Sequence, residues 1–195
     1  RYGIHVRVID YTDDMIQIVS SPRHGFGRHL NPCIDCKIGM LRRAKQLLET
    51  LNASFVVTGE VLGQRPMSQR RQTMRAIEKE SGLEDILLRP LCARNIEETL
   101  PERLGFVQRD ALWDLQGRGR KIQIERALSY GIGEEDIPTP AGGCLLADGQ
   151  IARKIRKTFD RCAPSLPERV DVMLDVVGRK FVFEDSTVLV VARDE

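Results

Sequence analysis

Residues 54–59 read S-F-V-V-T-G, a short run of aromatic and β-branched residues that ends at a glycine. A run of this length between polar residues is typical of a strand buried in a parallel sheet. Residues 85–91, D-I-L-L-R-P-L, form a second run of the same kind. The residues between them predict a helix over about 69–80. This order of strand, helix and strand is typical of a parallel sheet covered by helices.

The neighbouring segments extend this pattern. Residues 4–9, I-H-V-R-V-I, predict another strand, and residues 110–130 predict a helix interrupted near Gly117 and Gly119. Asn95 with Glu98 has the spacing of a helix cap with its capping-box partner. A helix is expected over 37–51 because apolar residues recur there at helical spacing, namely Leu41, Ala44, Leu47, Leu48 and Leu51.

The pattern changes after residue 136. A loop rich in proline and glycine leads to Cys144, and a basic helix over about 151–161 follows. Residues 170–193 predict a small α+β tail with strands at 180–183 and 187–191. We therefore expect an α/β protein in which residues 1–136 form the sheet domain, while residues 137–195 form the Cys144 loop, the basic helix and the tail.

The composition suits a soluble globular protein, with 42% hydrophobic and 30% charged residues. No stretch approaches the roughly 18 uninterrupted apolar residues of a membrane span. The first residues show no secretory signal. The odd number of five cysteines fits free thiols or metal ligands better than disulfides. We expect a cytoplasmic protein without a membrane partner.

The positive charges are clustered although the formal net charge is only +2. For any single cluster the ordinary explanation is a solvated helix face. Several clusters together modestly favour a polyanionic partner such as RNA. The candidate RNA-binding residues lie in two clusters, the first with Arg118, Arg120 and Lys121 and the second with Arg153, Lys154, Arg156 and Lys157. A third, looser group of positive charges consists of Arg65, Arg70, Arg71 and Arg75.

Two cysteines stand three residues apart in N-P-C-I-D-C, residues 31–36. Cys33 and Cys36 span one helical turn, so both thiols can face one metal ion or cluster. A four-cysteine zinc site needs a second C-x-x-C, which the sequence lacks. Three ligands with an open position remain, with Cys144 as the third. Cys92 and Cys162 are expected to be packing residues.

The loop G-E-V-L-G-Q-R-P-M-S-Q, residues 59–69, has the composition of a loop that meets a nucleotide. Gly59 and Gly63 allow close approach of the backbone, while Gln64 and Ser68 supply hydrogen bonds. A helix beginning near Ser68 offers its N-terminus to phosphate. An ordinary helix cap at Ser68 explains the same residues.

These stretches together carry a family likeness. N-P-C-I-D-C, T-G-E-V-L-G-Q-R-P-M-S-Q and L-L-R-P-L resemble the PP-loop ATPases that thiolate tRNA, namely the 4-thiouridine synthases and the tRNA 2-thiouridylases. The tail, with P-A-G-G-C-L-L-A-D and V-G-R-K-F, is similar to thiouridylase-like proteins. The resemblance implies a Rossmann-like sheet of the adenine-nucleotide alpha-hydrolase type and a tRNA sulfurtransferase activity.

The resemblance also implies a mechanism. ATP with Mg adenylates a uridine carbonyl oxygen, and sulfur from a persulfide carrier or sulfide then displaces AMP. Cys33 matches the first catalytic cysteine, and Cys144 lies where a persulfide-carrying cysteine is expected. Some relatives hold a [4Fe-4S] cluster on three cysteines, which Cys33, Cys36 and Cys144 match. The nucleotide is expected at Gly59, Gly63, Gln64, Ser68 and Gln69.

One signature is missing. The loop S-G-G-x-D-S, which holds the pyrophosphate of ATP in this family, does not occur in the 195 residues. Either the chain is truncated, or the loop is supplied elsewhere, or ATP chemistry has been lost. We favour truncation, because the chain begins inside the expected sheet; the fragment alone is then expected to be inactive.

Other functions stay open at this point. A non-catalytic metal- or cluster-binding module that binds RNA or protein uses the same cysteines and needs no ATP loop. Sulfur transfer to a small metabolite is a third hypothesis. The sequence is also compatible with a homodimer.

Overall fold

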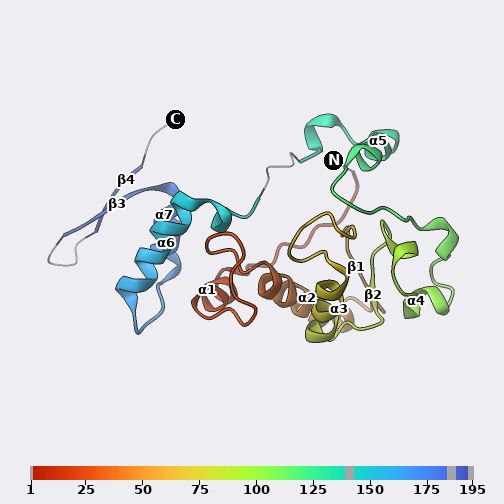
Figure 1. The fold of residues 1–195 in the computed structure, drawn as a ribbon, viewed down its shortest axis with the longest axis horizontal. Helices are drawn as coiled ribbons and strands as arrows, with labels where there is room; N and C mark the ends of the chain where they lie inside the picture. Colours follow the sequence, from red (N-terminus) through yellow and green to blue (C-terminus); the bar gives the residue numbers. More distant parts are fainter. Residues whose placement is uncertain (1, 139–142, 184–187, 193–195) are drawn as a thin grey trace. The chain divides into compact units, whose positions relative to one another are not determined.

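The computed structural model describes residues 2–138, 143–183 and 188–192, and Figure 1 shows its fold. The chain divides into two compact units, one of residues 1–32 with 144–195 and the other of residues 33–143. The predicted domain boundary after residue 136 stays a prediction. The elements are α1 (Thr12–Ser20), α2 (Cys33–Thr50), β1 (Val56–Val57), α3 (Arg71–Ser81), β2 (Leu87–Leu88), η1 (Ala93–Asn95), α4 (Leu100–Arg103), η2 (Arg109–Ala111), α5 (Lys121–Ser129), η3 (Glu134–Asp136), η4 (Leu145–Ala147), α6 (Gly149–Cys162), α7 (Arg169–Val177), β3 (Gly178–Val182) and β4 (Val188–Ala192).

The unit of residues 33–143 is built on a parallel strand pair. β1 pairs with β2, with Val56 opposite Leu87 and Val57 opposite Leu88. Helices α2 and α3 lie side by side near this pair (Figure 1). Their apolar faces and β2 share one core, whose buried members are Ile38, Leu41, Ile77, Leu83 and Leu87.

The predicted α/β class is confirmed in its coarse form, as a mixed protein with a small parallel sheet. Both predicted strands are present but shorter than expected. Their flanking residues form extended and turn structure instead; Thr58 N–H, for example, still donates to the carbonyl of Leu88 at 3.0 Å. A Rossmann-like arrangement stays a prediction.

A third segment lies beside the loop after β1. Leu62 and Gln116 form an isolated parallel bridge, and Gly117 N–H donates to the carbonyl of Leu62 at 2.8 Å. Both Gly63 and Gly117 have positive φ, and a Cβ on Gly63 would lie 3.6 Å from the Gly117 nitrogen. This distance is an ordinary contact, so it is the positive φ that favours glycine at both positions.

This arrangement corrects the helix predicted over 110–130. The α-helical part is only α5, Lys121–Ser129, because the preceding residues form η2 and the extended bridge segment. The predicted cap at Asn95 is also wrong, since Asn95 is the last residue of η1. The capping box lies four residues later, where Thr99 and Glu102 begin α4.

The unit of residues 1–32 and 144–195 contains α1, α6, α7 and an antiparallel hairpin of β3 and β4. α6 packs on α7 (Figure 1). Its buried cluster joins Leu30 with Ala152 and Ile155 of α6. The predicted basic helix is confirmed as α6, and the two tail strands are confirmed with shifted ends; residue 187 lies outside the described residues.

The strand predicted over 4–9 is wrong. The segment is in no strand, and Ile4, Val6 and Val8 are 75–89% exposed. An alternating pattern becomes a strand only when a neighbouring strand supplies hydrogen-bond partners, and no other described segment pairs with it. The helix that follows, α1, begins at Thr12 with Tyr11 as its N-cap.

Candidate functional site

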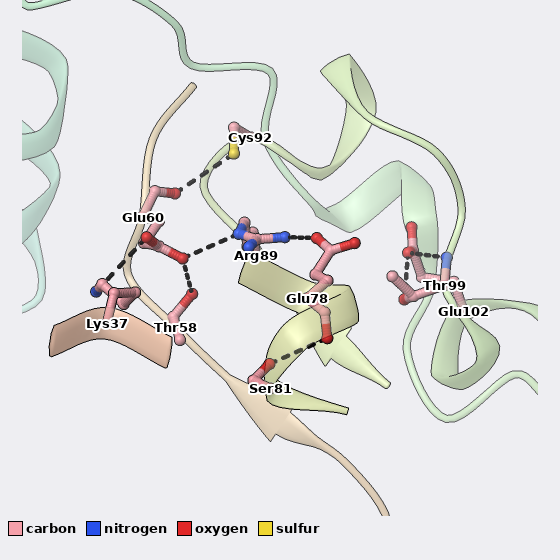
Figure 2. A network of polar contacts seen from close by, with 9 residues as sticks. All are labelled: Lys37, Thr58, Glu60, Glu78, Ser81, Arg89, Cys92, Thr99 and Glu102. Carbon is pink, nitrogen blue, oxygen red and sulfur yellow. Dashed lines mark hydrogen bonds and ion pairs between the residues drawn. The ribbon is translucent and has the colours of Figure 1, made fainter. Parts of the chain in front are cut away.

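Charged residues meet where the two parallel strands end, and Figure 2 shows them at close range. Glu60 follows β1 by three residues and Arg89 follows β2 directly. The Arg89 side chain is 1% exposed, and its Nε donates to Glu60 Oε2 at 3.0 Å. The Thr58 hydroxyl donates to the same oxygen at 3.2 Å. The carboxyl ends of parallel strands are the edge at which α/β proteins bind ligands.

Two further side chains balance the charges of this pair. Glu78 of α3 accepts a hydrogen bond from Arg89 Nη1, and Lys37 Nζ of α2 lies 3.5 Å from Glu60 Oε1. Two cations therefore face two carboxylates, as buried charges require. Arg89 Nη2 is buried and has no hydrogen-bond partner among the described residues. A donor left free in this way can bind an anion at the sheet edge.

The cysteines of N-P-C-I-D-C begin α2. Cys33 is the first residue of the helix, and both Cys33 and Cys36 are half-buried. They therefore lie on one helical turn, and i, i+3 residues share one face of a helix. Lys37 follows in the same turn and ties it to Glu60. The sheet edge and the cysteine pair thus belong to one connected site in this unit.

Cys144 belongs to the other unit, where it is exposed and precedes η4. Its predicted grouping with Cys33 and Cys36 stays a prediction. In the described parts of the chain, no three His, Cys, Asp or Glu side chains gather as a metal site requires. The α2 pair supplies two thiols, fewer than the three or four that hold a [4Fe-4S] cluster.

Cys92 is a packing residue, as predicted. It is fully buried beside Glu60, and its thiol donates to the Glu60 carbonyl at 3.4 Å. Burial raises the pKa of this thiol above its ordinary value, so the sulfur is protonated at neutral pH. Cys162 ends α6 and is half-buried.

The loop proposed to meet a nucleotide is held by its own residues. Gln69 is buried, its Oε1 accepts from Arg65 N–H at 2.8 Å, and its carbonyl accepts from Gly63 N–H at 2.7 Å. Gln64 donates to Gln123 of α5 at 3.0 Å. Gly59 and Gly63 are exposed. The backbone of the loop is therefore exposed at Gly59 and Gly63, while the hydrogen bonds of the buried Gln69 hold the loop in its conformation.

Helix α3 begins at Arg71, so Ser68 is not its N-cap, and Ser68 is buried. The N-cap residue, Arg70, makes no side-chain capping bond, and the first turn contains no acidic residue. The N–H groups of this turn and the arginines beside it form a donor set suited to phosphate. Backbone N–H groups and arginines are the kinds of donor that bind the phosphates of ATP. Nucleotide binding at these positions stays a prediction.

The candidate RNA-binding residues lie in both units. Arg118 and Lys121 are exposed at the start of α5, with Arg120 half-buried between them. On α6, Lys154 donates to the carbonyl of Gly178 at 2.7 Å, and the Arg156 guanidinium lies 5.5 Å from the centre of the Phe26 ring. These two therefore have structural contacts as well. Arg153 and Lys157 are exposed.

Sequence reasoning missed the charged network itself. The motifs L-L-R-P-L and G-E-V-L-G-Q contain Arg89 and Glu60, but their spacing indicates no role for either residue, and no motif points to Lys37 or Glu78. The available signal was a charged residue placed directly after a buried strand. Their partnership spans 29 residues of sequence and depends on the parallel pairing.

Comparison with models of protein families shows to which family the chain belongs. The family model described as thiamine biosynthesis protein (ThiI) matches residues 1–101 of the 195. The chain belongs to the ThiI family. This family transfers sulfur to tRNA, which confirms the expected class of tRNA-thiolating proteins. The match covers the cysteine pair, the glycine-bearing loop and the Glu60–Arg89 edge.

Comparisons with curated proteins and with solved structures gave no match. Within the described residues, no helix of this ThiI-family chain is both long and apolar enough to span a membrane.

Proposed function

We propose that this chain is the sulfur-handling part of a tRNA sulfurtransferase that acts on a uridine through Cys33 and Cys144. One observation carries the proposal. The Lys37–Glu60 contact joins the helical turn with Cys33 and Cys36 to the carboxyl ends of two parallel strands. A ligand bound at that edge lies within the same site as the thiols.

The chemistry begins with activation of the uridine. Its carbonyl oxygen attacks the α-phosphorus of ATP, pyrophosphate leaves, and the oxygen is then carried as AMP. The residues proposed for ATP are Gly59, Gly63, Gln64, Ser68 and Gln69. Exposed glycine backbone meets the phosphates, and buried Gln69 keeps the loop in shape. Arg89 Nη2 supplies a free donor nearby at the edge.

Sulfur insertion follows. The terminal sulfur of a persulfide on Cys144 attacks the activated carbon, and AMP leaves with the carbonyl oxygen. The Cys33 thiolate then attacks the Cys144 sulfur, which releases thiouridine and leaves a disulfide for a cellular dithiol to reduce. Cys144 is exposed, so a persulfide carrier can reload it. A cluster on Cys33, Cys36 and Cys144 with sulfide is the alternative version, and no step is assigned to it.

The experiment is a thiolation assay on the intact protein with unmodified tRNA, ATP, Mg²⁺ and a persulfide donor. Thiouridine is measured by mass spectrometry of the digested tRNA. We expect Cys33→Ser and Cys144→Ser to lose thiolation, and omission of ATP to abolish it. Cys162→Ser is the matched control, because Cys162 is also half-buried and lies outside the site. Full thiolation by both site variants contradicts the proposal.

Metal analysis separates the two versions. After anaerobic purification, the persulfide version predicts no stoichiometric iron. About four irons per chain, lost in all of the Cys33, Cys36 and Cys144 variants, support the cluster version instead. Zinc in place of iron, with tRNA binding but no thiolation, supports the non-catalytic RNA-binding module.

A further inference from the structure

A large cavity lies in the unit of residues 1–32 and 144–195, between α6, α7 and β3. Its volume is about 740 Å³, within the range of roughly 300–1,000 Å³ that ligand sites occupy. None of its lining residues belongs to the part of the chain matched by the ThiI family model. Its lining includes neither Cys33 nor Glu60 nor Arg89.

The cavity wall is strongly positive, because five cations line it with one carboxylate. Lys180 is fixed in place, with Nζ 3.1 Å from both Asp175 Oδ1 and the Thr158 hydroxyl. Lys157 and Arg179 are different. Both are exposed, and among the described residues neither forms an ion pair. Two exposed cations that line a cavity without an ion pair are suited to phosphate oxygens.

One buried oxygen in the wall lacks a donor. Asp175 is 1% exposed, and its Oδ1 faces Lys180, while its Oδ2 has no hydrogen-bond partner among the described residues. A buried acceptor left unpaired is costly, so a ligand that brings an N–H or O–H group to it gains that free energy. A nucleotide within an RNA chain offers such donors in its 2′-hydroxyl and in the N–H groups of its base.

An aromatic ring completes the wall. Phe181 of β3 lines the cavity and is 48% exposed. A half-exposed aromatic ring beside unpaired cations is the combination with which proteins bind unpaired nucleotides, since a base stacks on the ring while the backbone meets the cations.

We propose that this cavity binds one unpaired nucleotide of the RNA substrate. Its phosphates lie against Lys157 and Arg179, its base stacks on Phe181, and a hydroxyl or N–H group donates to Asp175 Oδ2. This inference rests on the proposed function, because it takes tRNA as the substrate. It assigns a docking place for the RNA to the unit of residues 1–32 and 144–195.

The test is tRNA binding by the intact protein, measured across a range of salt concentrations. We expect Lys157→Gln combined with Arg179→Gln to weaken binding about tenfold or more at low salt. The slope of log affinity against log salt becomes shallower by about 1.4, because each single-strand phosphate contact contributes about 0.7. Arg28→Gln, an exposed arginine of the same unit that does not line the cavity, is the matched control.

A second variant probes the ring. Phe181→Leu keeps an apolar side chain but removes the stacking surface, so affinity falls about tenfold while the salt slope stays constant. Wild-type circular dichroism in both variants establishes that each is folded.

The two proposals fail in different ways. If tRNA binds and both cavity variants bind it like wild type, the cavity inference is overturned while the thiolation proposal stands. If wild-type protein thiolates tRNA but the Arg28→Gln control loses as much affinity as the double variant, the loss reflects overall charge and again overturns the inference. Absence of both tRNA binding and thiolation in wild type overturns the proposed function and the inference with it.

Discussion

Arg89 is the residue on which the candidate site depends most. It is buried between Glu60 and Glu78, and its removal leaves Glu60 buried with one cation, Lys37, beside it. We expect Arg89→Met to lower the free energy of unfolding by about 3–5 kcal/mol, because a buried charge loses its partner. Urea denaturation followed by circular dichroism measures this change.

Arg75→Met is the matched control for that loss. Arg75 also pairs with a carboxylate, that of Glu97, but both side chains are exposed. Exposed pairs contribute less than about 1 kcal/mol. Equal losses of unfolding free energy in the two variants would contradict the prediction that a buried ion pair is costlier to break than an exposed one.

The cysteines provide a second prediction at this scale. In the folded protein we expect iodoacetamide to label Cys144 first, because it is exposed, and Cys92 last. Burial raises the pKa of Cys92, and the thiolate is the reactive form. Mass spectrometry of timed samples gives the order. Labelling of Cys92 before unfolding, at a rate close to that of Cys144, contradicts the structure.

Residue types were easier to predict from the sequence than residue partners. The spacing of their residues was enough to identify the cysteine pair and the glycine-bearing loop as candidate site segments. The ion pair of Arg89 with Glu60 did not, since nothing local in either stretch identifies a partner 29 residues away. Only the parallel register of β1 and β2 brings the two together.

At the scale of elements, the start of α4 gives a clear test. Thr99 N–H and its hydroxyl both donate to Glu102 Oε2, at 2.8 and 2.6 Å. We expect Thr99→Ala to cost about 1 kcal/mol of stability, the ordinary value of a helix cap. Chemical denaturation measures it.

Glu98→Ala is the control for this cap, because the sequence pattern had assigned the capping role to Glu98. Its side chain is exposed and takes no part in the capping box. A change within about 0.5 kcal/mol is expected. A larger loss at Glu98 than at Thr99 would place the cap where the sequence pattern predicted it.

The contact between α1 and α7 predicts a dependence on pH. Hydrogen bonds from Thr12 and Arg169 lower the pKa of Asp10 to about 2, and Arg169 also lowers the pKa of Asp13. A lowered pKa stabilises the fold above the ordinary value of about 3.8 and loses this effect as the pH falls towards 2.

Arg169→Gln is therefore expected to reduce the melting temperature slightly at pH 6, and its difference from wild type is expected to shrink as the pH falls from about 4 to about 2. The effect is small because the group is exposed. Thermal unfolding across this pH range measures it. A difference that grows as the pH falls contradicts the assigned ion pairs.

Helices with a cap and a regular apolar period were predictable, and α6 is the example. Asp148 accepts hydrogen bonds from Gln150 and Ile151 at its start, and the buried Ala152 and Ile155 follow at helical spacing. The helix predicted over 110–130 failed because Gly117 has a φ of 83° and its segment bonds to Leu62 instead. Tertiary pairing there overrides the local pattern.

For the whole molecule, the sequence could not show which distant segments share a unit. Leu30 N–H donates to the carbonyl of Leu146 at 3.1 Å, and Arg169 pairs with Asp10 and Asp13. These contacts join the first 32 residues to the tail. They depend on surfaces that no local motif records. For the same reason the sequence indicated Lys154 and Lys157 as candidate RNA-binding residues but not the cavity that they line.

The most direct test of sulfur transfer is a single-turnover experiment. The intact protein is loaded with radiolabelled persulfide sulfur, freed of donor, and mixed with ATP, Mg²⁺ and unmodified tRNA. The account predicts that label leaves Cys144 and appears in thiouridine at equal amounts, and that Cys33→Ser retains the label on the protein. Label that stays on wild-type protein while tRNA receives no sulfur would contradict the account.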